Sequence, residues 1–236
     1  MNTYKIADLI VHMDTFGRTL AQAEPYRIAD DENMKPDIKI VSKPEHVLEK
    51  NSLLTLDECE YLSSGASFCR QLVQYDSLML HSSCVVVDER AYLFSAPCGT
   101  GKSTHVRLWL ELFGDRAYIL NDDKPVLRII DGEIYAYGTP WSGKEDLSRN
   151  ERVLLGGIAV VERATENSIC PLDPQRALYS IFNQTTRFIT PMYMGQFMDT
   201  VGKIVESGKI YKLSCNMDIS AARLSYETMS GKRFTV

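Results

Sequence analysis

The chain has 236 residues and a formal net charge of −5, with 44% hydrophobic and 24% charged residues. This composition is typical of a globular protein with one large domain or one domain and a small lobe. The acidic balance argues against nucleic-acid binding as the main role. No apolar run approaches the ~18 residues of a membrane span and no signal pattern opens the chain, so we expect a cytoplasmic protein without a membrane partner.

The first part of the chain, residues 1–54, is predicted to be a β-rich N-terminal extension. Short alternating runs at 5–11 and 37–41 predict antiparallel strands, with Pro25 and Pro36 between the runs and Pro44 after them. The extension carries no recognisable chemistry. Residues 55–236 are therefore predicted to form the functional domain.

A helix is expected to open this second domain. Thr55 and Glu58 have the spacing of a capping box, which predicts a helix that begins at Leu56. Apolar residues recur along it at helical spacing and predict one buried stripe, formed by Leu62, Phe68, Leu72 and Val73.

The stretch 80–104, LHSSCVVVDERAYLFSAPCGTGKST, predicts two strands, a glycine-bearing loop and the start of a helix that ends before Gly114. This is the layout of a phosphate-binding loop, although the usual first glycine is Ala96. Backbone N–H groups and the helix start would bind phosphate oxygens, Lys102 would reach the terminal phosphates, and the Ser103 hydroxyl would ligate Mg²⁺. The predicted nucleotide-binding residues are Pro97, Cys98, Gly99, Thr100, Gly101, Lys102, Ser103 and Thr104.

Two carboxylates follow the next predicted strand. Residues 116–120 form a short apolar run that ends in Asn121-Asp122-Asp123. Carboxylates at the end of a strand beside a phosphate loop are well placed for metal binding and proton transfer. One aspartate is expected to hold Mg²⁺, and the other to accept a proton from an attacking hydroxyl.

A hairpin and a loop follow the aspartates. Asp131-Gly132 lies between two apolar runs, 126–130 and 133–137, and predicts a type I′ turn. The loop 138–144 has two interpretations: a substrate-covering or anion-binding loop with Lys144, or a connection that packs Trp141 on the core.

The rest of the chain is predicted to complete an α/β fold. A buried strand is expected at 154–162 and another at 210–215. Helices that cover the sheet are predicted at 174–183, 192–206 and 219–229, each with a start or stop signal. The six cysteines lack metal-ligand spacing, so we expect reduced thiols.

Three features together resemble the superfamily of HPr kinase/phosphorylase and the C-terminal domain of phosphoenolpyruvate carboxykinase. They are His81-Ser82-Ser83 ahead of the loop, the loop itself, and Asp122-Asp123. The resemblance covers about residues 55–160. It implies a P-loop-containing mixed β-sheet core with flanking helices, and a kinase that uses ATP and Mg²⁺ or Mn²⁺.

Carried over by position, the resemblance also implies roles for single residues. Ser103 with Asp123 (or Asp122) would bind the metal, His81 would be a metal ligand or a polar group near the transferred phosphate, and Asp122 would be the base. Lys102 and Lys144 would complete the catalytic set. The acceptor hydroxyl stays open between a protein or peptide serine and a small metabolite, and a homo-oligomer is compatible with the sequence. A small carboxykinase-like lyase and a non-catalytic nucleotide sensor are the alternative functions.

Overall fold

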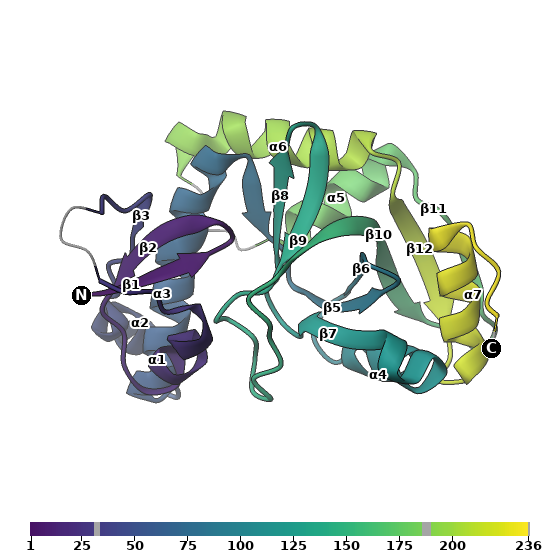
Figure 1. Cartoon of the computed structure of the whole chain (residues 1–236), viewed down its shortest axis with the longest axis horizontal. Helices are drawn as coiled ribbons and strands as arrows, with labels where there is room; N and C mark the ends of the chain where they lie inside the picture. The colour runs from purple at the N-terminus through teal and green to yellow at the C-terminus, as the bar shows by residue number, and fades with distance from the viewer. Residues whose placement is uncertain (31–33, 186–189, 236) are drawn as a thin grey trace.

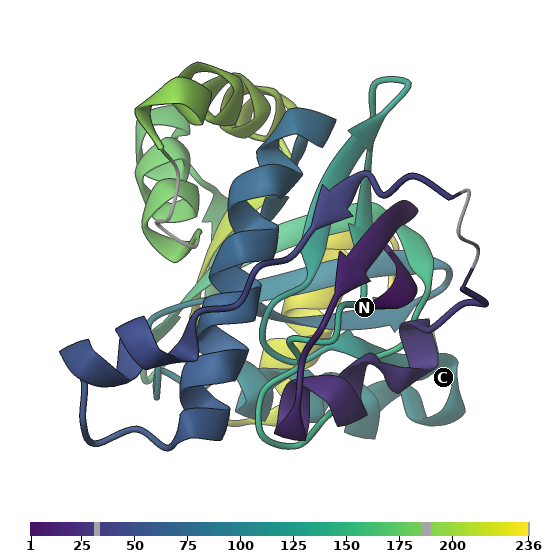
Figure 2. The ribbon, with the colours of Figure 1, turned by 90° about the vertical axis from the view of Figure 1, so that its left-hand side faces the viewer.

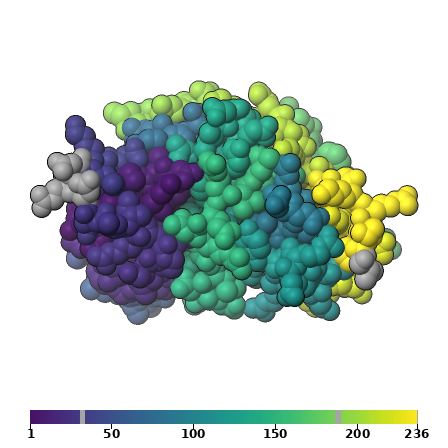
Figure 3. All heavy atoms as spheres, viewed as in Figure 1, coloured from purple at the N-terminus to yellow at the C-terminus, as the bar shows by residue number. Residues whose placement is uncertain are grey.

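The computed structural model describes residues 1–30, 34–185 and 190–235 as a mixed α/β structure with two sheets and flanking helices (Figure 1). A three-stranded sheet forms from the N-terminal residues, and a curled nine-stranded sheet forms the rest. The two ends of the chain lie at opposite sides of the molecule (Figure 3). No helix in these ranges is long and apolar enough to cross a membrane.

The small sheet contains a hairpin where the sequence predicts one strand. β1 (Asn2–Ile6) and β2 (Leu9–Met13) pair in antiparallel register around Ala7 and Asp8, whose φ values are +53° and +59°. The expected strand at 5–11 is therefore wrong, because this tight turn contains none of the glycine or asparagine that signals one. β3 (Ile38–Lys39) pairs in parallel with β2, so the antiparallel arrangement expected for this strand is wrong.

Two short helices and one 3₁₀ turn of this region were not expected from the sequence. They are α1 (Gly17–Ala23), η1 (Glu24–Tyr26) and α2 (Pro44–Lys50). The hydrophobic core under the small sheet extends into the next helix and the large sheet. The domain boundary at residue 54 stays a prediction.

The long helix α3 (Leu56–Leu72) lies between the small sheet and the large one (Figure 2). Its capping box is confirmed: Glu58 N donates to Thr55 Oγ1 at 3.2 Å, and Thr55 N donates to Glu58 Oε2 at 2.9 Å. Phe68 is buried as predicted, but Leu62 is 42% exposed, so its place in the buried stripe is wrong.

The large sheet is mixed, with strand order β4-β8-β9-β10-β6-β5-β7, and β12 pairs with β10 and β11. The hairpin at Asp131-Gly132 and the two paired strands ahead of the glycine-rich loop are confirmed, whereas β11 was not expected. The strands are β4 (Ser77–Met79), β5 (Ser82–Val87), β6 (Arg90–Ser95), β7 (Ala117–Asn121), β8 (Val126–Ile130), β9 (Glu133–Tyr137), β10 (Arg152–Arg163), β11 (Ser168–Pro171) and β12 (Ile210–Cys215).

Helices cover both faces of this sheet. α4 (Lys102–Phe113) and α7 (Ile219–Ser230) pack in one apolar cluster, and α5 (Pro174–Gln184) and α6 (Met194–Glu206) pack in another. α6 begins two residues later than predicted, because Pro191–Tyr193 forms the 3₁₀ turn η4. The remaining 3₁₀ turns are η2 (Val73–Tyr75) and η3 (Gly114–Arg116).

The direction of three neighbouring strands determines where polar groups meet. β5 is antiparallel to both β6 and β7, so β6 and β7 run the same way. The carboxyl ends of β6 and β7 and the amino end of β5 consequently share one edge of the sheet. This edge carries the glycine-rich loop, His81 and the aspartate pair.

Candidate functional site

The loop between β6 and α4 has the backbone that phosphate binding requires. Gly99 and Gly101 have φ values of +76° and +119°, which L side chains rarely adopt. An added Cβ at either position would meet no atom within 4 Å, so the backbone conformation is what calls for glycine. The loop leads directly into the N-terminus of α4, whose first N–H groups have no partner within the helix. Loop and helix start together have the arrangement of backbone donors that can bind an anion.

Lys102 is folded back on this loop. Its Nζ donates to the carbonyl oxygens of Ala96 at 2.8 Å and Pro97 at 3.4 Å, and the side chain is buried. Burial lowers the pKa of Lys102, while the neighbouring Cys98 and Asp123 act in the opposite direction. Cys98 and Pro97 are themselves exposed. A cation is thus held within the loop, bonded only to carbonyl groups that a phosphate could replace.

Ser103 faces Asp122 and not Asp123. Its Oγ lies 3.3 Å and 3.4 Å from the two carboxylate oxygens of Asp122. Ser83 Oγ, from the start of β5, lies 3.4 Å from the same hydroxyl. Oxygen atoms from three neighbouring segments therefore converge beside the phosphate loop, and oxygen is the ligand that Mg²⁺ prefers.

Asp123 points into a different set of side chains. Its Oδ1 lies 3.5 Å from His81 Nε2, and its Oδ2 accepts from Lys124 Nζ at 2.6 Å and from the Tyr61 hydroxyl at 3.2 Å. Burial raises the pKa of Tyr61, with the Asp123 charge as a second cause, so Tyr61 remains a donor. Neither Tyr61 nor Lys124 was identified from the sequence. Tyr61 lies on α3, 62 positions away, and no local signal joins it to the aspartates.

A hydrogen bond at Nδ1 orients the His81 imidazole. Nδ1–H can donate to Gln184 Oε1 at 3.2 Å, and His81 N donates to Gln184 O at 2.8 Å. Burial, followed by the Lys102 charge, lowers the pKa of His81. In the neutral tautomer with the proton on Nδ1, the Nε2 lone pair faces the Asp123 carboxylate. Two facing acceptors of this kind can share a proton or a cation.

An asparagine turn explains why adjacent aspartates diverge. Asn121 Oδ1 accepts from the backbone N–H groups of Asp123 at 3.0 Å and Lys124 at 2.7 Å. Its amide Nδ2 donates to Thr139 O at 2.9 Å, which fixes the turn against the loop 138–144. The turn directs one carboxylate to Ser103 and the other to His81.

The loop 138–144 contacts the aspartate site through its backbone. Gly143 N donates to the Tyr61 hydroxyl at 3.0 Å, and Gly143 O accepts from Gln22 Nε2 at 2.9 Å. Trp141 is fully buried and stacks on Phe68 at 4.8 Å, which supports the core-packing interpretation for that residue. Lys144 is exposed, and its charge acts on Glu58 at the start of α3. The predicted role of Lys144 at the acceptor stays a prediction.

The predicted metal ligands Ser103, Asp123 and His81 do not converge on one point. Ser103 pairs with Asp122, and His81 pairs with Asp123. Within the described ranges, no group of three His, Cys, Asp or Glu side chains could hold a metal ion by itself. A loop hydroxyl and one carboxylate fit a Mg²⁺ ion that keeps several waters and is completed by substrate phosphates.

A cavity of about 440 Å³ adjoins the loop at the carboxyl ends of β10 and β12. It begins at Thr100, Gly101 and Thr104, so it is continuous with the phosphate-binding backbone. Arg163 stands at its edge and donates to Gly99 O at 2.5 Å and to Thr100 O at 3.1 Å. Apolar side chains form much of the remaining wall, among them Leu108, Val161 and Met217.

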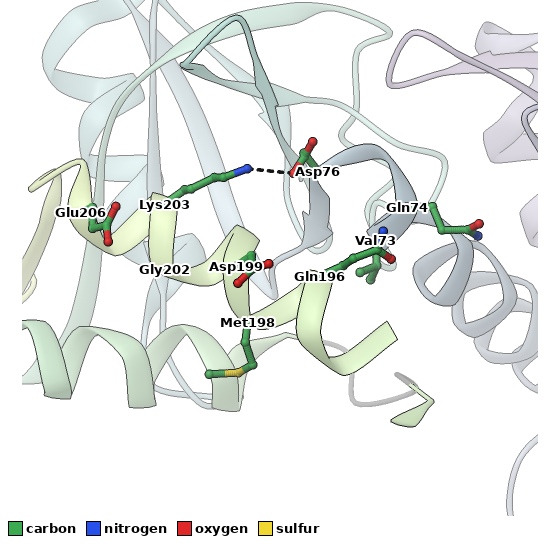
Figure 4. Close-up of a pocket in the computed structure, with 9 residues that line it drawn as sticks. All are labelled: Val73, Gln74, Asp76, Gln196, Met198, Asp199, Gly202, Lys203 and Glu206. Atoms are coloured by element: carbon green, nitrogen blue, oxygen red, sulfur yellow. Dashed lines mark hydrogen bonds and ion pairs between the residues drawn. The ribbon is translucent and has the colours of Figure 1, made fainter. Parts of the chain in front are cut away.

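Another cavity, of about 360 Å³, lies away from these residues, between η2 and α6 (Figure 4). Lys203 Nζ pairs with Asp76 Oδ1 across it at 3.1 Å, and Asp199 and Glu206 add negative charge. Arg128 donates to Ala7 O at 2.7 Å, beside the small sheet. Neither feature belongs to the loop site.

No protein-family model and no curated protein matches the sequence. A similar solved structure is the Hpr(Ser) kinase/phosphatase from Coxiella burnetii, with 17% identity and a TM-score of 0.30. The match covers 41% of this chain and 71% of that chain. At this identity and TM-score the likeness carries no conclusion about activity, and the function proposed below rests on the geometry of the site.

Proposed function

We propose that the protein is an ATP-dependent phosphotransferase that moves a phosphoryl group from nucleotide to an acceptor hydroxyl. The observation that carries this proposal is the position of Ser103: it opens α4 directly after the loop and lies 3.3–3.4 Å from both oxygens of Asp122. A hydroxyl and a carboxylate beside a phosphate-binding helix start are the protein contribution to a Mg²⁺–nucleotide site.

The nucleotide is oriented by the loop and the adjoining cavity. Its phosphates lie on the backbone of residues 99–103, and its base enters the 440 Å³ cavity between Leu108 and Met217. Binding takes Lys102 Nζ from the carbonyl oxygens of Ala96 and Pro97 to the phosphate oxygens. Mg²⁺, held by Ser103 and Asp122, neutralises phosphate charge when bound.

The other aspartate serves the acceptor. Asp123 with His81 accepts the proton of the attacking hydroxyl, because the two acceptor atoms face each other at 3.5 Å. Tyr61 and Lys124 hold the carboxylate in place through its second oxygen. This reverses the first assignment from the sequence, in which Asp122 is the base and Asp123 the metal ligand.

The test follows label from γ-labelled ATP into pooled alcohols, sugar phosphates and cell-extract proteins in the presence of Mg²⁺. Two lysines give a matched comparison. Lys124→Ala removes the cation bonded to Asp123 and should lower transfer at least tenfold, whereas Lys144→Ala should leave it within about twofold. Tight ATP binding with no label on any acceptor would contradict the proposal and favour a nucleotide sensor. An effect of Lys144→Ala as large as that of Lys124→Ala would restore the role predicted from the sequence.

A further inference from the structure

A cavity of about 340 Å³ lies at the opposite end of the strands that carry the nucleotide site. β6, β10 and β12 bring the loop, Arg163 and Cys215 to one end, and Arg90, the 155–156 segment and Lys209 to the other. A strand of six residues separates the two ends by about 20 Å, so they are distinct sites. The second cavity is lined by Arg90, Tyr92, Leu155, Gly156, Lys209, Met229, Ser230 and Lys232.

Among the described residues, three cations and no carboxylate line this cavity. Arg90 makes no ion pair with any residue that the structure describes, and Lys209 Nζ donates to Leu155 O at 3.3 Å. Lys232 Nζ is 3.9 Å from Asp88 Oδ2 and 60% exposed. The single long ion pair to Lys232 leaves the cavity with a net positive charge, in a chain whose net charge is −5.

Asp88, the nearby carboxylate, is committed to other partners. It accepts from Arg116 Nη2 at 3.0 Å and from the Tyr226 hydroxyl at 2.8 Å. Both bonds lower the pKa of Asp88, which keeps the carboxylate ionised and bound to them. The C-terminal carbonyl groups of α7, near Ser230, place a partial negative charge at this cavity, opposite in sign to the charge of the three cations.

Tyr92, a largely buried residue with a hydroxyl group, lines the same cavity. Tyr92 is only 2% exposed, and its hydroxyl has no hydrogen-bond partner among the described residues. Burial raises the pKa of Tyr92, so the group stays a donor at physiological pH. Trp109 holds the ring from one side, with ring centroids 4.9 Å apart. The hydroxyl is therefore a donor that an acceptor bound in the cavity could use.

Gly156 keeps the hydroxyl end of this ring accessible. The register of β10 against β6 shifts between Leu155 and Gly157, which places Gly156 in a bulge. A Cβ at position 156 would lie 2.6–2.7 Å from Cε1 and Cζ of Tyr92. The absence of a side chain here is therefore needed both for the ring position and for the space beside it.

We propose that this cavity binds a small phosphate-bearing anion with at least two negative charges. Its charged side chains can only donate hydrogen bonds, and its other polar side chains, Tyr92 and Ser230, carry hydroxyls. The volume of the cavity exceeds that of a single phosphate group. Leu155 and Met229 provide an apolar wall for an uncharged part of the ligand. This inference is independent of the activity proposed for the loop site.

The experiment measures inorganic pyrophosphate binding by calorimetry at constant ionic strength. All proteins carry Lys102→Ala, which weakens binding at the phosphate loop. We expect Arg90→Ala with Lys232→Ala to weaken the remaining affinity at least tenfold, and Tyr92→Phe, which removes only the hydroxyl, to weaken it about threefold to tenfold. The control Lys43→Ala with Lys50→Ala makes the same charge change on exposed lysines elsewhere and should have no effect.

Three outcomes would overturn the proposal. One is an absence of pyrophosphate binding in the Lys102→Ala protein. Another is an equal loss in the Lys43/Lys50 control, which would indicate general charge attraction. The third is equal binding of citrate, which would overturn the assignment to phosphate. Failure of label transfer at the loop site would not bear on any of them.

Discussion

The two anion sites proposed at the ends of β6, β10 and β12 are built in different ways. At the loop end, consecutive backbone N–H groups and a helix start create the field, and Lys102 adds one charge from the same short stretch. At the other end, the charge comes from side chains separated by up to 142 positions, from Arg90 to Lys232. The first site is encoded locally, whereas the second exists only after the sheet has formed.

The largest expected effect is the loss of activity on substitution of Lys102, which alters the loop end and leaves the other end unchanged. Lys102→Ala should reduce kcat/KM for ATP by about 10³-fold, or ~4 kcal/mol of transition-state stabilisation, because it is the cation nearest the phosphates. Initial rates of label transfer measure this change. A rate within tenfold of wild type would place the catalytic charge elsewhere.

The next largest effect is a loss of stability on substitution of Gly156, at the end of the strands opposite the loop. Gly156→Ala should lower the free energy of unfolding by about 1–3 kcal/mol, since the new methyl group overlaps the Tyr92 ring. Urea denaturation checks this value, and ATP affinity should stay unchanged. The control is Gly195→Ala, where an added Cβ meets nothing within 4 Å and the helix should be as stable or more stable. Equal effects of the two substitutions would contradict the account of the bulge.

Acid should act on the loop end through His105, which lines the nucleotide-side cavity. Burial lowers the pKa of His105 from 6.5 to about 4, so the folded state resists a proton that the unfolded state accepts. His105 therefore leaves the free energy of unfolding unchanged above pH 6.5 and lowers it progressively as the pH falls toward 4. At pH 5 the loss should be between about 1 and 2 kcal/mol.

His105→Gln should flatten this dependence, measured by urea unfolding at pH 5 and pH 7. The exposed His46→Gln is the matched control and should keep the wild-type slope. Glu60 acts in the opposite direction, because burial raises its pKa to about 6, but it is common to all three proteins. Identical slopes for the three proteins would exclude His105 as the cause.

The sequence is informative where the physics is local. The Thr55–Glu58 capping box, the Asp131-Gly132 turn and the loop at 96–103 were predicted because each depends on residues within a few positions. The Ala7-Asp8 turn was missed because its residues adopt a positive φ without glycine. Only the tertiary fold reveals such a turn.

The sequence indicated which residues lie together at the candidate site, but not which of their side chains contact each other. The loop, His81 and both aspartates were identified, yet the sequence could not show that Asn121 directs the two carboxylates to different partners. Tyr61 and Lys124 escaped notice because one lies on a distant helix and the other looks like an ordinary turn lysine. Partner choice depends on side-chain directions that periodicity does not encode.

The most direct measurement is a Mg²⁺ titration of label transfer in Asp122→Asn and Asp123→Asn. Asp122→Asn should raise the half-saturating Mg²⁺ concentration at least tenfold, because it removes the carboxylate beside Ser103. Asp123→Asn should leave that concentration unchanged and lower kcat by about 10²- to 10⁴-fold, because it removes the proton acceptor. The reverse pattern, or the same shift in both variants, would contradict the division of roles proposed here.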